Sequence, residues 1–248
     1  MSEDFRVVIP ARYASSRLPG KPLADIAGKP MISWVCERAL ASGAAEVCVA
    51  TDDERIAAAV RDTGASVELT TTDHESGTDR IAEVTAKRQW PDDAIVVNLQ
   101  GDEPLMPPRL VSQVASLLSS DVEASVATLV TPIESDEEWR DPNVVRVVLD
   151  RDNRALYFSR AQIPWPRDGA MPHAARHIGL YAYRVSALLE LAATPPCDLE
   201  QIEKLEQLRA LWLGMQIAVA EAVETPPRGV DTQADLERAR AILDGSHG

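Results

Sequence analysis

The chain has 248 residues, which suits one α/β domain or one domain with a small lobe, and its 45% hydrophobic and 26% charged residues are typical of a globular protein. Its 39 acidic and 25 basic residues give a formal net charge of -14, and a field of that sign argues against a nucleic-acid partner without excluding a nucleotide. Three scattered cysteines without a C-x-x-C pair, and no stretch typical of a signal peptide or membrane span, predict free thiols, a cytoplasmic location and no membrane partner.

The first half of the chain alternates short apolar runs, rich in β-branched residues, with amphipathic stretches of helical period. Strands are predicted at 5–9, 47–50, 67–69, 95–99 and 125–130, and helices at 30–41, 53–61, 77–88 and 107–118. Ser76 is a candidate N-cap for the third helix. Near-continuous apolar strands separated by helices predict a mostly parallel sheet covered on both faces, with ligands beyond the carboxyl ends of its strands.

The second half of the chain is less regular. Strands are predicted at 144–149, 155–158, 178–183 and 217–222, a loop at 163–176, and helices at 199–213 and 232–243, the last with Thr232 as its cap. No internal repeat or linker interrupts the pattern. The sequence therefore predicts a single domain over 1–248, with a small β-rich lobe at about 132–183.

The loop that follows the first predicted strand is rich in cationic and small polar residues. Two arginines, two serines, a glycine and a lysine fall between Arg12 and Lys21. Such a loop can offer backbone N–H groups and three cations to a triphosphate. It matches neither G-x-x-x-x-G-K-[ST] nor G-x-G-x-x-G, which disfavours a P-loop ATPase and a dinucleotide-binding fold. The alternative interpretation is a solvated basic loop.

A second polar segment, Gln100-Gly101-Asp102-Glu103-Pro104, follows the fourth predicted strand. A carboxylate at a strand end, beside a phosphate-binding loop, is a natural ligand for Mg²⁺. Gly101 would allow the backbone to approach a ligand closely. The alternative is a simple turn, because Gly, Asp and Pro form turns for local reasons.

Eight motifs in order resemble one family over almost the whole chain. They are P-A-R-Y-x-S-x-R-L-P-G-K-P-L from Pro10, D-H-E-S-G-T-D-R from Asp73, V-N-L-Q-G-D-E-P from Val97, Y-F-S-R from Tyr157, I-P-W from Ile163, R-H-I-G-L-Y from Arg176, L-E-Q-L-R from Leu205 and G-V-D-T from Gly229. This series is similar to the 3-deoxy-manno-octulosonate cytidylyltransferases, also called CMP-Kdo synthetases. The first motif alone would be shared with the enzymes that make CMP-sialic acids.

The resemblance implies a three-layer α/β nucleotidyltransferase-type fold with a mostly parallel central sheet, an embedded β-rich dimerisation lobe and a homodimer. It implies an enzyme that transfers CMP from CTP to 3-deoxy-D-manno-octulosonate (Kdo) for lipopolysaccharide biosynthesis, with Mg²⁺ as cofactor. By position, the nucleotide-binding residues would be Ala11, Arg12, Ser15, Arg17, Lys21, Arg80 and Gln100, the catalytic residues Arg12, Lys21 and Asp102, the metal ligands Asp102 and Asp231, and the sugar-binding residues Arg160, His177, Tyr181, Glu206 and Gln207.

Two other functions stay open at this stage: a cytidylyltransferase for another acidic sugar, such as an 8-amino Kdo or a sialic-type acid, and a catalytically silent nucleotide-binding relative. The presence of Lys21 and both metal carboxylates argues against the silent relative. On the sugar side, each residue alone would be interpreted as core or surface, and only the motif pattern assigns it a role. The chain also departs from the family near Pro196, where two residues are added, and His74 is assigned no role.

Overall fold

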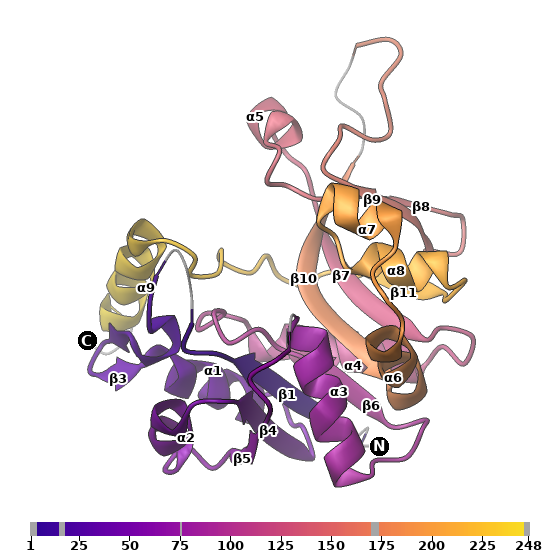
Figure 1. Ribbon diagram of the computed structural model, residues 1–248. Helices are drawn as coiled ribbons and strands as arrows, with labels where there is room; N and C mark the ends of the chain where they lie inside the picture. Colours follow the sequence, from indigo (N-terminus) through magenta and orange to yellow (C-terminus); the bar gives the residue numbers. More distant parts are fainter. Residues whose placement is uncertain (1–3, 15–17, 75, 170–173, 246–248) are drawn as a thin grey trace.

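A twisted nine-stranded sheet runs through the computed structural model, and helices lie on both of its faces (Figure 1). The main path has the strand order β11-β7-β10-β6-β1-β4-β5, and β8 and β9 are added beside β10. The structure describes residues 4–14, 18–74, 76–169 and 174–245. Two residues predicted to bind the nucleotide, Ser15 and Arg17, therefore lie outside the described residues.

Four strands of the first half run parallel: β1 (Phe5–Ala11), β4 (Glu46–Thr51), β5 (Ser66–Leu69) and β6 (Ile95–Asn98). The central strand β1 is apolar except for Arg6, as suits a strand that is covered on both faces. Val7 and Ile9 pack on one face, Val8 packs on the other, and all three have no exposed surface. The mostly parallel α/β sheet predicted from these apolar runs is confirmed.

Helices α1 (Met31–Leu40), α2 (Glu54–Val60) and α4 (Pro108–Ser119) cover the face of Val7 and Ile9. Helix α3 (Gly77–Arg88) covers the face of Val8 together with α6 (Val185–Ala193). Helix α3 begins where predicted, because Ser76 and Asp79 form a capping box in which each side chain accepts from the other's backbone N–H at 3.1 Å.

The second half adds β7 (Val126–Pro132), β8 (Arg146–Leu149), β9 (Ala155–Ser159), β10 (Ala175–Arg184) and β11 (Ile217–Glu221). Strand β10 is antiparallel to both β6 and β7, with a shift of register between Ile178 and Tyr181. The first residues of β10 also pair with β8, which pairs with β9. The strands of the predicted β-rich lobe therefore extend the same sheet. Strand β10 belongs to both parts, because its first residues pair with β8 and its last residues pair with β6.

The predicted single helix at 199–213 is wrong. The chain forms α7 (Asp198–Glu203) and α8 (Gln207–Trp212), and Lys204 between them has a left-handed φ of 56°. The break has two visible causes: the buried Leu205 turns into the core, while Ser159 donates a 2.6 Å hydrogen bond to Glu203. Helix α6 was not predicted, because the sequence after β10 has no residue typical of a helix N-cap. Arg184 stands at the N-cap position, and its side chain makes no capping hydrogen bond.

The last helix, α9 (Gln233–Gly245), lies far from the strand that precedes it. An extended segment, yellow in Figure 1, leads from β11 across the molecule to α9. There Leu236 and Leu243 pack with Trp34 of α1 and with the hairpin of β2 (Asp25–Ile26) and β3 (Lys29–Pro30). Thr232 accepts from the Asp235 N–H at 3.2 Å, as the predicted cap would.

The short helix α5 (Asp136–Arg140) projects above the sheet beside β8 and β9. Within the described ranges, no helix is long and apolar enough to cross a membrane.

Candidate active site

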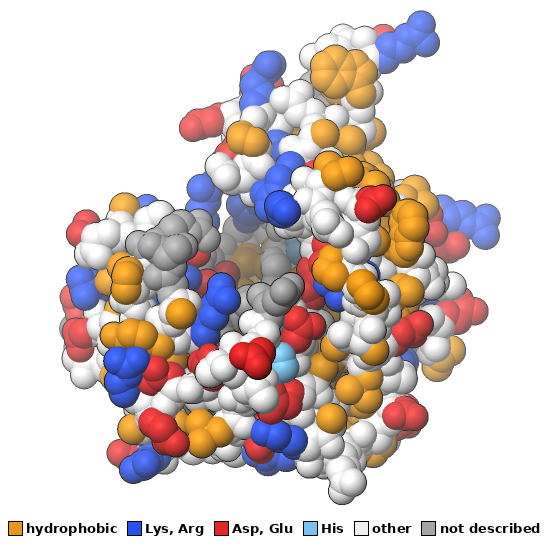
Figure 2. Space-filling view, viewed as in Figure 1, with side chains coloured by type: hydrophobic (Ala, Val, Ile, Leu, Met, Phe, Trp, Pro, Cys, Tyr) orange, Lys and Arg blue, Asp and Glu red, His pale blue; other side chains and the backbone are white. Residues whose placement is uncertain are grey.

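A cavity of about 280 Å³ opens beyond the carboxyl ends of β1 and β6. The loop after β1 contributes Arg12 and Lys21 to its lining, and the start of α3 contributes Gly77 and Arg80. Among the predicted nucleotide residues, the lining includes Ala11, Arg12, Lys21, Arg80 and Gln100. Figure 2 shows the surface hollowed between the side that carries α9 and the side that carries α7, with Lys and Arg side chains gathered around the hollow.

Lys21 binds two carboxylates that come from distant parts of the chain. Its ammonium lies 2.6 Å from Asp102 Oδ2, at the end of β6, and 3.2 Å from Asp231 Oδ1, just before α9. The two acidic segments are joined by a 2.8 Å hydrogen bond from the Val230 N–H to the Asp102 carbonyl. Lys21 opens the short helix η1 (Lys21–Leu23), and Gly20 supplies the left-handed φ of 69° at the turn before it. Both carboxylates therefore face one point.

A third carboxyl group, Glu103, crowds this point. Burial, and then the charges of Asp102 and Asp231, raise the pKa of Glu103 to about 8, so it carries a proton at neutral pH. Gly229 leaves room for the side chain of Glu103, because a Cβ at position 229 would lie 2.6 Å from Glu103 Oε1. The negative charges of Asp102 and Asp231 attract a cation to this point, and the Lys21 ammonium is the cation found there.

The oxygen donors of this cluster fit Mg²⁺, which binds through one or two carboxylates and takes its remaining ligands from water and substrate phosphates. In the part of the chain that the structure describes, no group of three or more His, Cys, Asp or Glu side chains is arranged to hold a metal by itself. A metal held by Asp102 and Asp231 would therefore depend on phosphate and water for the rest of its coordination.

The side chains at the α3 end of the cavity are fixed by the protein. Arg80 is 3% exposed, donates to the Thr70 hydroxyl, and lies 3.2 Å from Asp52 Oδ2. Gln100 donates from Nε2 to Asn98 Oδ1 at 3.1 Å, which orients its amide. These contacts cost little to maintain during binding, because the side chains are already ordered.

Gly101 lines the cavity, and the approach of its backbone to a ligand stays a prediction. Its lack of a side chain also has a role within the protein. A Cβ at Gly101 would lie 2.9 Å from the Pro10 carbonyl oxygen of β1. Glycine here lets the segment that carries Asp102 pack directly against the end of β1.

A second cavity, of about 610 Å³, lies on the other side of the carboxylates, and both Asp102 and Asp231 line it as well. Of the predicted sugar-binding residues, His177 lines this cavity. Its Nε2 lies 3.0 Å from the Thr128 hydroxyl, and burial of the ring lowers the pKa of His177 to about 3. The imidazole is therefore neutral and acts as a hydrogen-bonding group.

Tyr181 lies beside His177, and Glu206 is close enough to Tyr181 for its charge to act on the tyrosine hydroxyl; neither residue lines that cavity. The Tyr181 ring is 5.1 Å from that of His177, and its buried hydroxyl has no hydrogen-bond partner among the described residues. Burial raises the pKa of Tyr181 well above its usual value and also raises that of Glu206, whose side chain bonds Thr78. A buried hydroxyl without a partner is costly, and a polar ligand would satisfy it.

The other two residues predicted to bind the sugar, Arg160 and Gln207, lie near Glu203 and Glu206. The Arg160 Nε donates to the Glu203 carbonyl at 3.0 Å, and its backbone N–H donates to the Glu203 carboxylate at 3.0 Å. Gln207 is the first residue of α8, next to Glu206. Neither lines the two cavities above. The structure thus groups His177, Tyr181 and Glu206, and places Arg160 one contact away through the turn that divides α7 from α8.

One residue that sequence reasoning left aside, His74, lines the 280 Å³ cavity. A single histidine in a polar loop carried no signal of its own. The partner that fixes it, Glu83, lies nine residues further along the chain on α3. The signal was available only in the position of His74 within the D-H-E-S-G-T-D-R motif, two residues before the helix cap.

Comparisons with known proteins agree with this geometry. The cytidylyltransferase family model matches residues 6–217. A 3-deoxy-manno-octulosonate cytidylyltransferase of Pseudomonas fluorescens is 55% identical, over 98% of this chain and 100% of the relative, and one of Methylococcus capsulatus is 54% identical over 99% of each. The fold is that of a solved CMP:2-keto-3-deoxy-manno-octonic acid synthetase in complex with CTP, with a TM-score of 0.92, 47% identity, and coverage of 98% of this chain and 100% of that one.

Fold, cavity and family model define a nucleotidyltransferase of the cytidylyltransferase class. A putative glucose-1-phosphate thymidylyltransferase of Bacillus anthracis, at 15% identity and a TM-score of 0.67, shares the fold alone. At more than half identity over nearly its whole length, the chain belongs to the 3-deoxy-manno-octulosonate cytidylyltransferase family.

Proposed function

We propose that the protein transfers CMP from CTP to Kdo and releases pyrophosphate, with Mg²⁺ as cofactor, in the supply of activated sugar for lipopolysaccharide assembly. One observation carries the proposal. The cation of the loop after β1 and two carboxylates, Asp102 and Asp231, meet at the junction of the two cavities. A nucleotide in the smaller cavity and a sugar in the larger one would bring their reacting atoms together there.

The reaction is the attack of the sugar's anomeric hydroxyl on the α-phosphorus of CTP, with pyrophosphate as the leaving group. Positioning and charge neutralisation supply most of the rate in such transfers. Arg12 and Lys21 stand where the triphosphate would lie, so their cations can offset the charge that develops on pyrophosphate. Mg²⁺ bound at Asp102 and Asp231 would supply charge neutralisation for the phosphate oxygens.

On the sugar side, the hydrogen-bonding groups suit a polyhydroxylated acid. The neutral His177 and the unpartnered Tyr181 hydroxyl can bond sugar hydroxyls, and Glu206 can accept from them. Arg160 is suited to the sugar's carboxylate, because a guanidinium matches a carboxylate bidentately. We assign Gln207 to the same group from its position next to Glu206.

The protein acts, in this proposal, in the cytoplasm as a homodimer formed through the β-rich lobe. That lobe carries two large apolar side chains on its surface, with Leu156 59% and Trp165 75% exposed. Their exposure is explained if a second copy covers them. Sedimentation equilibrium tests the dimer, since a mass of one chain at micromolar concentration would contradict it.

The experiment that tests the function is pyrophosphate release by the pure protein with Mg²⁺. Kdo is combined with CTP, UTP, ATP or GTP, and CTP is combined with Kdo, an 8-amino Kdo or a sialic acid. Release with CTP and Kdo above all other pairs is expected. Preference for another acid by more than about tenfold, which corresponds to roughly 1.4 kcal/mol, would replace Kdo as the acceptor and keep the nucleotide half of the proposal.

A further inference from the structure

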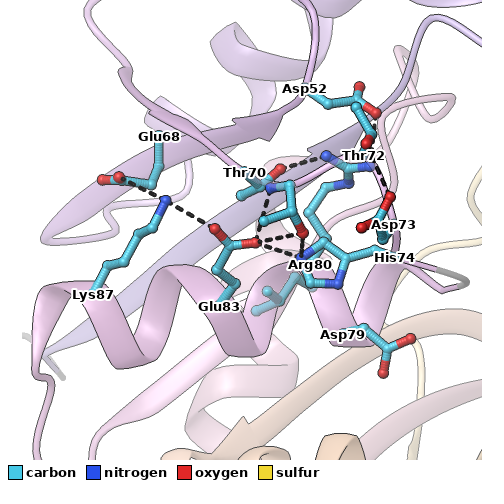
Figure 3. Close-up of polar contacts among 12 residues, drawn as sticks. Asp52, Glu68, Thr70, Thr72, Asp73, His74, Asp79, Arg80, Glu83 and Lys87 are labelled. Carbon is cyan, nitrogen blue, oxygen red and sulfur yellow. Dashed lines mark hydrogen bonds and ion pairs between the residues drawn. The ribbon is translucent and has the colours of Figure 1, made fainter.

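His74 forms part of the wall of the nucleotide cavity, in the loop between β5 and α3, and the mechanism above gives it no task. His74 lines both the 280 Å³ cavity and a neighbouring one of about 600 Å³, and its side chain is 18% exposed. Figure 3 shows that its ring is held from the side of α3 by Glu83. A polar ring fixed at the edge of a ligand cavity invites the question of which atom it offers to the ligand.

One ring nitrogen of His74, Nε2, forms hydrogen bonds within the protein. It contacts the Glu83 carboxylate and lies 3.2 Å from the Thr71 hydroxyl. The same carboxylate accepts from the Thr71 N–H at 3.0 Å and lies 2.8 Å from the Lys87 ammonium. Burial raises the pKa of Glu83, but hydrogen bonds from Lys87, His74 and the Thr71 backbone outweigh it and lower the pKa to about 2. Glu83 is therefore an anion that can only accept hydrogen bonds.

This anion determines the tautomer of His74. Because an ionised carboxylate has no hydrogen to donate, the hydrogen in its contact with Nε2 must come from the ring. A neutral imidazole has one N–H, so Nδ1 is left with a free lone pair and accepts hydrogen bonds. In Figure 3 the second ring nitrogen of His74 faces away from Glu83. His74, which lines the cavity, thus carries a hydrogen-bond acceptor at Nδ1, and Glu83 determines which of the two ring nitrogens is the acceptor.

The charge distribution in the cavity indicates which part of a nucleotide meets this acceptor. Arg12 and Lys21 belong to the loop after β1, Lys21 lies beside the carboxylates of Asp102 and Asp231, and these two cations attract the triphosphate. The base would then contact the lining around the start of α3, which holds His74, Gly77 and Arg80, and where the Arg80 cation is already paired with Asp52. We propose that His74 is a specificity-determining residue whose Nδ1 accepts a hydrogen bond from the amino group of cytosine, and that Glu83 is the positioning residue that sets its tautomer.

This proposal rests on the proposed function and refines it, because it explains how the enzyme would reject UTP. Cytosine carries an amino donor at the position where uracil carries a carbonyl acceptor. Opposite a fixed acceptor, cytosine gains a hydrogen bond, whereas uracil leaves two lone pairs facing each other and unsatisfied. Sites built around one such buried polar group reject the mismatched ligand strongly.

The test compares kcat/KM for CTP and for UTP, with Kdo as acceptor, at pH 8, where an ordinary histidine is neutral. The variants are His74→Gln, His74→Asn, Glu83→Gln and, as control, Glu68→Gln. A glutamine amide can reach Glu83 as Nε2 does but offers no acceptor near the Nδ1 position, whereas asparagine places its amide near that position. Glu68 also binds Lys87 and Arg88 of α3, yet it does not touch His74.

His74→Gln should lower the ratio of CTP to UTP efficiency by about ten- to a hundredfold, the usual range for one buried hydrogen bond and its mismatch. His74→Asn should retain more of that preference. Glu83→Gln should lower the ratio too, because an amide can donate to Nε2 and move the ring hydrogen to Nδ1. Glu68→Gln should leave the ratio unchanged. Equal losses for both nucleotides in the His74 and Glu83 variants would reduce both residues to a structural role and overturn the proposal.

Nitrogen NMR of the imidazole rings separates failure of this proposal from failure of the proposed function. The free wild-type protein should show His74 with hydrogen on Nε2, and CTP but not UTP should shift its Nδ1 signal. A ring with hydrogen on Nδ1 would overturn the proposal even if the wild type makes CMP-Kdo. If the wild type transfers no cytidylyl group to any acid, the proposed function fails, while a CTP-specific shift at Nδ1 would still support the base contact.

Discussion

Replacing Lys21 by methionine is expected to change metal binding and turnover in opposite directions. In the free protein, the Lys21 ammonium lies 2.6 Å from Asp102 and 3.2 Å from Asp231, the two carboxylates proposed to hold Mg²⁺. The Lys21 ammonium and a metal ion therefore compete for the same carboxylate oxygens in the free protein. A bound nucleotide would remove this competition, because its phosphates would pair with the ammonium. Methionine fills a similar volume without the charge, so the variant should keep its fold.

The size of the effect on metal binding follows from exposure. The Lys21 side chain is 13% exposed, whereas those of Asp102 and Asp231 are 32% and 50% exposed. Ion pairs in contact with water contribute about 0.2–1 kcal/mol each, and the half-exposed Asp231 pair belongs at the low end. A total of about 1 kcal/mol corresponds to roughly fivefold tighter metal binding by the variant without nucleotide. Turnover should fall by about 10²–10³, as for the loss of one preorganised donor at a developing anion.

Manganese titration followed by electron paramagnetic resonance measures the first quantity, and steady-state pyrophosphate release measures the second. The matched control is Lys29→Met, which removes a surface lysine that also forms a 2.6 Å ion pair, with Glu37. The control should change neither quantity. Weaker manganese binding by Lys21→Met, or turnover within a few fold of the wild type, would refute the competition described here.

Three further changes are expected to act through packing and charge. Gly101→Ala should cost about 1–3 kcal/mol in urea unfolding and reduce turnover, because its Cβ would lie 2.9 Å from the Pro10 carbonyl oxygen, whereas Gly245→Ala meets no atom within 4 Å and should be neutral. Glu200→Gln should cost about 3–5 kcal/mol, because it leaves the Arg209 guanidinium, 7% exposed, without its counter-charge; a loss below about 1 kcal/mol would count against a buried pair. Since folding lowers the pKa of Glu83 from 4.5 to about 2, its stabilisation is present above pH 4.5 and is lost as the pH falls toward 2. The difference in unfolding free energy between wild type and Glu83→Gln should therefore shrink over that window, and a constant difference would contradict the ionised, hydrogen-bonded state of Glu83.

Local sequence signals predicted the first half of the fold well, because there each element is determined by its own residues. The run from Phe5 to Ile9 is apolar except for Arg6, and its three consecutive apolar residues Val7, Val8 and Ile9 predict a strand that is buried on both faces. Ser76 and Asp79 specify the start of α3 by reciprocal capping, and α3 begins where predicted. The loop after β1 and the Asp102 segment then meet because parallel strands end at one edge of a sheet.

The elements that were missed depend on contacts between distant residues. The helix predicted at 199–213 is divided because Glu203 is bound by Ser159 of β9, more than forty positions earlier, and no local signal reports that pairing. His74 was overlooked for the same reason, since its role depends on Glu83 and on a cavity that exists only in the folded chain. The close packing of Gly101 against the Pro10 carbonyl of β1 is likewise a contact that the sequence does not show.

The measurement that tests the central claim most directly follows the α-phosphorus of CTP. CTP labelled at that phosphorus is incubated with Kdo, Mg²⁺ and either wild-type protein or Asp102→Asn, and CTP binding by each protein is measured by calorimetry. We predict that the wild type moves the label into a sugar nucleotide with the mass of CMP-Kdo and one equivalent of pyrophosphate, whereas Asp102→Asn binds CTP but transfers little label. Wild-type protein that binds CTP without moving the label to Kdo, or Asp102→Asn protein that transfers it at the normal rate, would contradict the account.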